Sequence, residues 1–283
     1  MKKLNLGKKN VVPDSITQTY VIMKYSFLDY IRSRRFFVLL LIALIIGGLL
    51  TGIVGYFRPQ LFLSDVLSFY SGWWGNSITF LIILSAIFFG GDAISGEFQN
   101  KTGYFIAGNP IGRSSLYIGK YLAALIGSLI ILMLFAVMTL ANAAYYFGGS
   151  ALPYQFVQSL LLSLLYLLSA LGLTFFFSSL FKSSAMSIIT TVILLLFVFS
   201  LLQTLVATLA GIQPFFVLTY GAGVITHVLS AQYPPTVTHV QVSPNFSETA
   251  YNASLLDGII IMVVYFAVTS VLGLILFERK EFN

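Results

Sequence analysis

Few residues in this chain are of the types that carry out chemistry, and their spacing matches no catalytic or metal-binding motif. His227 and His239 precede Glu248 and Asp257, but this spacing fits no common metal site. The sequence has no Cys, no Gly-x-Ser-x-Gly and no His-Glu-x-x-His, the signatures of cysteine, serine and zinc catalysis. We therefore expect no catalytic residue, no metal site and no cofactor bound by the chain itself.

The nearest approach to a phosphate-binding loop is Gly112 followed by Gly119-Lys120. A P-loop has four residues between its glycines and a Ser or Thr after its lysine. Here six residues separate the glycines and Tyr121 follows the lysine. The chain is therefore not expected to bind a nucleotide in this way.

The composition indicates that most of the chain crosses a membrane. Of its 283 residues, 58% are hydrophobic and 8% are charged, whereas a soluble domain has about 45–50% apolar and 25% charged residues. So few charges cannot solvate a globular surface. The formal net charge of +6 does not indicate nucleic-acid binding, because the basic residues share no folded aqueous surface.

Six uncharged stretches are long enough to cross the hydrocarbon core, which takes about 20 apolar residues. They predict an all-α, polytopic membrane domain over residues 36–277. The first stretch is too long, and its basic leader too extended, for a cleaved signal peptide, so we expect it to be retained. The stretches are approximately Phe36 to Phe57, Val66 to Gly91, Tyr121 to Phe147, Tyr154 to Phe181, Ala185 to Ala210 and Gly258 to Phe277.

The distribution of Lys and Arg predicts the orientation of these spans. If the N-terminus is cytoplasmic, all 15 basic residues except Arg58 fall on the cytoplasmic side. Such an asymmetry is typical of cytoplasmic loops. We therefore expect a protein of the cell membrane whose leader, residues 1–35, and tail, residues 278–283, are both cytoplasmic.

The leader is expected to contain an amphipathic helix between Asp14 and Arg35. Ser15 and Gln18 have the spacing of a capping box, and apolar residues recur at helical intervals. Such a helix would lie in the lipid headgroup layer with its basic residues toward water and anionic lipid. Contact with a cytoplasmic partner is a second interpretation. The apolar positions are Ile16, Tyr20, Met23, Phe27 and Ile31, and the basic ones are Lys24, Arg32, Arg34 and Arg35.

Residues 211–257 are expected outside the cell. Within them, Pro214 to Leu229 is apolar but short, and making it a span would place the basic C-terminal residues outside. We interpret it as an interfacial or re-entrant segment before the last helix. Two sequons fall in the same region, so Asn245 and Asn252 are possible glycosylation sites.

Gly48 and Gly52 form a Gly-x3-Gly pair in the first span. Small residues let helices approach closely. The pair is explained either by packing within one subunit or by a homodimer seam.

The longest cytoplasmic connection inside the membrane domain, residues 92–120, resembles a known transporter loop. Glu97 is followed by Thr102, then by Pro110-Ile111-Gly112-Arg113, and Gly119-Lys120 enters the next span. This order is similar to the signature of the permease subunits of ABC exporters of the type-2 membrane family.

There is one departure from the family pattern. Lys101 stands where a glycine is usual, and Gly103 follows Thr102. The turn around Thr102 is therefore expected to differ in detail.

The resemblance implies a permease subunit that is driven by a separate ATP-binding subunit, in which ATP and Mg are bound. In this family the loop forms a coupling helix that docks on that subunit, so Glu97, Thr102, Pro110 and Arg113 are implied as partner contacts. Two alternatives involve no partner. Arg113 could be one of the basic residues that favour the cytoplasmic side, and Pro110 could serve to end a helix. Lys120 is interpreted as extending to lipid headgroups.

The resemblance further implies a second permease copy or paralogue and an amphipathic or lipid-like substrate that is exported. The spans contain no charged residue, which argues against a carrier driven by H⁺ or Na⁺. Two alternatives stay open: an integral-membrane lipid-modifying enzyme and a non-transporting membrane component of an ABC complex. An enzyme would need a base, metal or nucleophile near the interface, and the sequence offers none.

Overall fold

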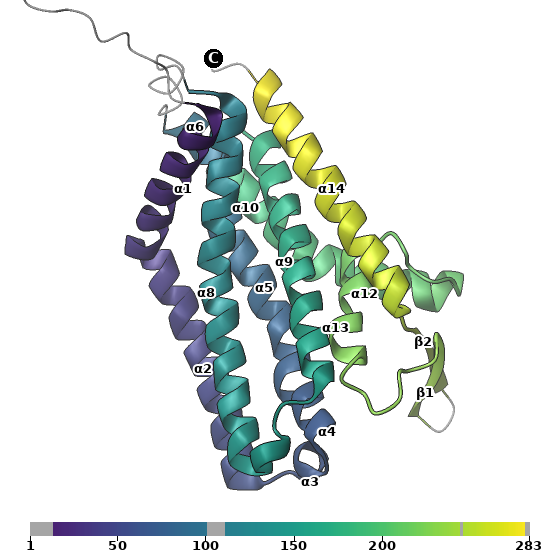
Figure 1. The fold of residues 1–283 in the computed structure, drawn as a ribbon. Coiled ribbons are helices and arrows are strands. Elements are labelled where there is room, and N and C mark those ends of the chain that lie inside the picture. Colours follow the sequence, from purple (N-terminus) through teal and green to yellow (C-terminus); the bar gives the residue numbers. More distant parts are fainter. Residues whose placement is uncertain (1–13, 101–110, 244–245, 281–283) are drawn as a thin grey trace, which may run out of the picture.

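The computed structural model describes residues 14–100, 111–243 and 246–280. Within these ranges, six helical segments are long and apolar enough to cross a membrane, so the expected polytopic helical fold is confirmed. The start of the first helix and the end of the last one lie at the same end of the bundle (Figure 1). The six segments are Arg34–Phe57, Val66–Gln99, Arg113–Phe147, Tyr154–Leu180, Ser184–Ala210 and Leu255–Arg279.

Three spans form the centre of the bundle: α5 (Asn76–Gly90), α8 (Arg113–Phe147) and α9 (Tyr154–Leu180). Half or more of the apolar window in each of these spans is buried, against 22% in each of the other three. The outer spans are α2 (Arg34–Phe57), the run that starts with α10 (Ser184–Val192), and α14 (Leu255–Arg279). Most of their large exposed side chains are apolar, as expected for a surface that faces lipid.

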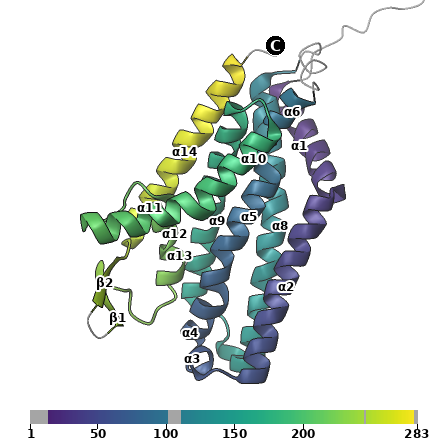
Figure 2. The same ribbon diagram turned by 180° about the vertical axis from the view of Figure 1, so that it is seen from behind.

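Two of the spans contain wide π-helical turns. A π segment, Ser71–Gly75, joins α4 (Val66–Tyr70) to α5. The run from α10 continues through further elements and leans away from the bundle at its far end (Figure 2). These elements are a π segment at Ile193–Val198, α11 (Phe199–Leu205) and a second π segment at Val206–Ala210.

The leader forms α1 (Ser15–Arg32), which runs along the first half of α8 (Figure 1). Its N-cap is Asp14, whose side chain accepts the Ser15 amide, so the helix does not begin with Ser15 as the cap. A Cβ at Gly119 of α8 would lie 2.8 Å from Ile22 Cγ2, and only glycine allows this approach. Ile16, from the expected apolar face, points away from the bundle with 77% of its surface exposed.

Ser33 is the one residue between α1 and α2. Its backbone is extended, with φ −75° and ψ 147°, which ends α1. Its hydroxyl accepts the Phe36 amide and so also caps α2.

The third span begins earlier than the sequence indicated, at Arg113 and not at Tyr121. The polar and charged residues at its start lower the hydropathy but do not interrupt the helix. The helix has 35 residues, or about 52 Å at 1.5 Å per residue, so it exceeds the hydrocarbon thickness of about 30 Å. Lys120 therefore lies on a helix and not in a loop.

The segment before the last span contains two short helices, α12 (Leu218–Ala222) and α13 (Val224–His227), and no further span. They pack closely on α14, since a Cβ at Gly221 would lie 2.9 Å from Ile261 Cγ2. A β-hairpin follows, in which β1 (Val237–Ser243) pairs antiparallel with β2 (Phe246–Tyr251). The hairpin corrects the expectation of a purely α-helical chain.

Between α2 and α4 lies α3 (Gln60–Leu63), a single turn. A turn of 3₁₀ helix, Gly148–Ser150, follows α8 at the same end of the bundle. Both elements close the bundle at the end opposite the termini (Figure 1).

Candidate functional site

The candidate site is the short helix α6 (Ser95–Gln99), which carries Glu97. It follows α5 at the end of the bundle where α1 begins and α14 ends (Figures 1 and 2). Residues of three different spans, α8, α9 and α10, contact it.

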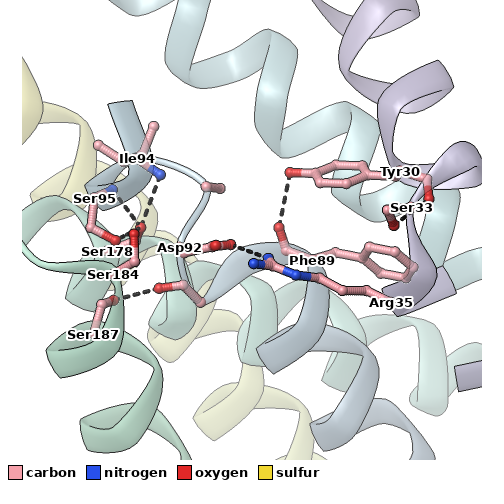
Figure 3. Close-up of polar contacts among 12 residues, drawn as sticks. Tyr30, Ser33, Arg35, Phe89, Asp92, Ile94, Ser95, Ser178, Ser184 and Ser187 are labelled. Atoms are coloured by element: carbon pink, nitrogen blue, oxygen red, sulfur yellow. Dashed lines mark hydrogen bonds and ion pairs between the residues drawn. The ribbon is translucent and has the colours of Figure 1, made fainter. Parts of the chain in front are cut away.

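Ser178 of α9 holds the start of α6. Its buried hydroxyl oxygen accepts the amides of Ile94 at 2.9 Å and Ser95 at 3.0 Å (Figure 3). The first amides of a helix have no partner within the helix. Ser178 supplies that partner from a neighbouring span, so α6 is fixed to α9.

The start of α10 holds both ends of the same segment. The Ser187 hydroxyl donates to the carbonyl of Gly91, just before α6 (Figure 3). At the other end, the Ser184 amide donates to Gln99 Oε1 at 2.7 Å. The stretch from Gly91 to Gln99, which contains α6, is therefore attached to a second span at both of its ends.

Lys120 of α8 supplies the third attachment. Its ammonium forms an ion pair with Glu97 and donates to the Ala93 carbonyl at 2.9 Å. Only 15% of the Lys120 side chain and 16% of the Glu97 side chain are exposed. The expectation that Lys120 extends to lipid headgroups is wrong, because its position in the second turn of α8 directs it onto α6.

A second ion pair joins the first span to the end of α5. Arg35 Nη1 of α2 lies 2.6 Å from Asp92 Oδ1, and the Tyr30 hydroxyl of α1 donates to the Phe89 carbonyl at 2.9 Å (Figure 3). Burial raises the pKa of Tyr30, so this hydroxyl keeps its proton at neutral pH. Both helices of the N-terminal region are thus tied to the segment that leads into α6.

A family model described as ABC-2 family transporter protein matches residues 20–282. The chain belongs to this family. It is a permease component of an ABC transporter and a multi-pass membrane protein, and membership implies an ABC ATP-binding subunit as partner. No curated protein matches the chain significantly.

In this ABC-2 permease, Arg113 lies at the first position of α8 and contacts the end of α14. Its Nη1 donates to the carbonyls of Glu278 at 2.7 Å and Lys280 at 2.8 Å. The last carbonyls of a helix lack internal partners, and Arg113 satisfies them. Arg113 contacts α14 and Glu97 contacts α8 within the permease, and their contact with the ATP-binding partner stays a prediction.

Lys280 links the end of α14 to α9 and α6. Its ammonium donates to the carbonyls of Ser179 at 2.9 Å and Phe181 at 2.8 Å, and it lies 4.3 Å from the centre of the Phe98 ring. A cation over an aromatic face is attracted by the ring quadrupole. Sequence reasoning missed Lys280, because its partners lie about a hundred residues earlier in the chain.

A polar cavity of about 300 Å³ opens beside α6, between α1 and α8. Its walls include both ion pairs and Asp29, which has no ion-pair partner among the described residues. It is lined by charged groups at the end of the bundle where α1 begins and α14 ends.

Two of the predicted contacts, Thr102 and Pro110, lie outside the described residues. So does Asn245, the first possible glycosylation site. Asn252, the second one, donates through Nδ2 to Pro235 O and to Thr238 Oγ1, both at 2.8 Å, so its amide supports the hairpin.

Gly48 and Gly52 face away from the rest of the permease. A Cβ added at either position would meet no atom within 4 Å, whereas one at Gly47 would collide with Met138. Gly47, and not the predicted pair, is therefore the glycine of these three that contacts another helix of the same subunit. The dimer seam stays a prediction.

His227 does not form a metal centre with other residues of the described ranges, where no group of three or more His, Cys, Asp or Glu is found. Burial lowers its pKa, so the imidazole is neutral at pH 7. Its ring packs edge-on against Tyr233, with centroids 5.8 Å apart.

Proposed function

We propose that the chain is the membrane half of an ATP-driven exporter that works as a permease dimer with two ATP-binding subunits. It moves an amphipathic or lipid-like substrate outward across the cell membrane. Membership of the ABC-2 family supports this proposal. ATP and Mg bind in the partner subunits, and the permease supplies the path and the docking site.

The attachment of α6 to three spans is the observation that carries the proposal. Lys120 ties it to α8, Ser178 ties it to α9, and Ser184 ties it to α10. A short helix held this firmly cannot shift without moving the spans around it. Closure of the ATP-binding subunits against α6 is thereby converted into movement of the membrane helices, a transfer between packed rigid elements.

Glu97 has a positioning role in this mechanism. Its pairing with Lys120 orients α6 and leaves the adjacent polar cavity open to a partner. Both termini and α6 lie on the cytoplasmic side in this proposal, where the ATP-binding subunit is found.

The experiment is co-purification of the permease with the ATP-binding subunit encoded next to it. Wild-type permease in proteoliposomes should stimulate ATP hydrolysis, and Glu97→Gln should reduce the stimulation about tenfold or more, because α6 loses its tie to α8. Asp14→Asn is the matched control, since it makes the same charge change at the same end of the bundle. It should leave stimulation unchanged, because Asn also caps a helix.

The dimer and the direction of transport need their own readouts. The mass of the purified complex should correspond to two permeases and two ATP-binding subunits. A fluorescent lipid analogue should move away from the leaflet that faces the ATP-binding subunits when ATP is added. Full stimulation by Glu97→Gln, or a complex with one permease, would contradict the proposal.

A further inference from the structure

A cavity of about 440 Å³ lies beside the start of α14, the end of that helix that is remote from α6 (Figure 1). It is open on one side and is lined by the turn before α12 and by the first three turns of α14. Its walls are aromatic and aliphatic except for one carboxylate; they include Phe215, Phe216, Ile260, Val264 and Tyr265, with Asp257 as the charged member. The volume is within the range of small-molecule sites, about 300–1,000 Å³.

Asp257 brings a negative charge into this apolar cavity. The Ser254 hydroxyl donates to Asp257 Oδ2 at 2.6 Å and accepts the Asp257 amide, which caps α14. No ion pair or further hydrogen bond reaches Oδ1 within the part of the chain that the structure describes. The sequence has no Lys or Arg between Lys182 and Arg279, and no Lys or Arg of the described residues forms an ion pair with Asp257.

The aromatic residues of the cavity favour a cation as its occupant. Phe215 and Phe216 are about half exposed, at 49% and 56%. The Tyr265 hydroxyl donates to the Phe216 carbonyl at 2.6 Å, so the turn is fixed to α14. Aromatic rings attract organic cations through their quadrupole, and a carboxylate beside them adds a direct charge pair.

We propose that this cavity binds a lipophilic organic cation. Its apolar groups fill the space between the turn and α14, and its charge pairs with Asp257. A neutral lipid would leave the carboxylate without a counter-charge, and a lipophilic anion would be repelled by it. The site belongs to this chain's own residues and depends neither on the ATP-binding partner nor on the direction of transport.

The test is equilibrium binding of tetraphenylphosphonium to the full chain in nanodiscs of phosphatidylcholine, with empty nanodiscs as the blank. Tetraphenylborate has the same shape and the opposite charge, so it controls for hydrophobic partition. We expect saturable binding of the phosphonium and none of the borate. Asp257→Asn should weaken phosphonium binding about tenfold or more, the effect of losing one charge pair.

Three further variants separate charge from structure. Asp65→Asn removes another capping carboxylate, which accepts the Ser68 amide at the start of α4, and should leave binding unchanged. Ser254→Ala removes the cap of α14 but keeps the charge, so binding should change less than about threefold. Phe216→Leu keeps an apolar wall but loses the aromatic ring. It should weaken binding of the phosphonium and leave partition of the borate unchanged.

The proposal is overturned if Asp257→Asn and wild type bind the phosphonium equally, or if the borate, measured alone, also binds saturably. If Asp257→Asn does not fold, as judged by size-exclusion chromatography, phosphonium binding is measured in Asp257→Glu and Phe216→Leu. Retained binding in the former and weakened binding in the latter support the site. The reverse pattern refutes it.

Discussion

Lys120 of α8 and Glu97 of α6 form an ion pair at the junction between a spanning helix and the candidate docking helix. The same ammonium donates to the Ala93 carbonyl, so one side chain holds both the start and the middle of the segment around α6. Both side chains are more than four-fifths shielded from solvent. The pair therefore fixes α6 more firmly than a surface ion pair would.

Removal of either partner of this pair should destabilise the permease. Lys120→Met leaves the Glu97 carboxylate partly buried without its counter-charge, and the expected cost is about 1–3 kcal/mol. Thermal unfolding in detergent measures this, with Lys24→Met on the exposed face of α1 as the control. The double variant Lys120→Met/Glu97→Gln should recover part of the loss. Additive losses in the double variant would show that the two side chains do not interact.

Ser178→Ala should loosen α6 without unfolding the bundle. The amides of Ile94 and Ser95 would lose their acceptor, which costs about 1–3 kcal/mol. Hydrogen–deuterium exchange of a peptide covering residues 92–100 should become faster. Ser163→Ala is the matched control, because this buried serine of α9 donates only to a carbonyl of its own helix. Equal exchange in both variants would argue against the attachment.

Gly48→Leu and Gly47→Leu should have opposite effects. A Cβ at Gly48 meets no atom of the same chain within 4 Å, so the monomer with leucine there should fold normally while a dimer that uses this face should dissociate. Leucine at Gly47 collides with Met138 and should lower the stability of the monomer. Light scattering reports the dimer and thermal unfolding reports the monomer. A stable Gly48→Leu dimer would place the seam elsewhere.

Lys280 should titrate at an unusually low pH. Burial, with a contribution from the charge of Lys182, lowers the pKa of Lys280 to about 8. Between this pH and about 10.5, the folded chain holds fewer protons at this site than the unfolded chain, so stability should rise with pH in that window. Below pH 8 both states are protonated and the dependence should vanish.

The pKa of Lys280 can be read by NMR of ¹³C-methylated lysines, with the Lys280→Met spectrum giving the assignment. Lys280→Met should also remove the rise of the melting temperature above pH 8. An ordinary lysine pKa near 10.4 would mean that Lys280 does not occupy the carbonyl cluster.

The six spans could be predicted from the sequence because their signal is local. A run of about 20 apolar residues has few alternatives to crossing the membrane, and α9 shows this well, since it begins at the expected Tyr154. The start of α8 could not be predicted in the same way. Arg113 and Lys120 lower the hydropathy there, although both are compatible with a helix.

The contacts of the site depend on tertiary structure and left no local signal. Glu97 was selected by its resemblance to a family motif, but its partner Lys120 lies 23 residues away on another helix. The residues next to Ser178 and Lys280 in the sequence do not indicate that these two side chains hold α6 and the end of α9. The β-hairpin was missed because its strands are short and its segment was assigned outside the membrane only by exclusion of a further span.

Ser33 is the only residue that connects α1 to α2. α1 is held on α8 through Ser15 and Ile22, and α2 is held to the end of α5 through Arg35. A change in the angle between α1 and α2 therefore requires a change in the φ and ψ of Ser33, because no loop connects the two helices. A displacement of the first span should therefore also displace the first half of α8, and a displacement of α8 should displace the first span.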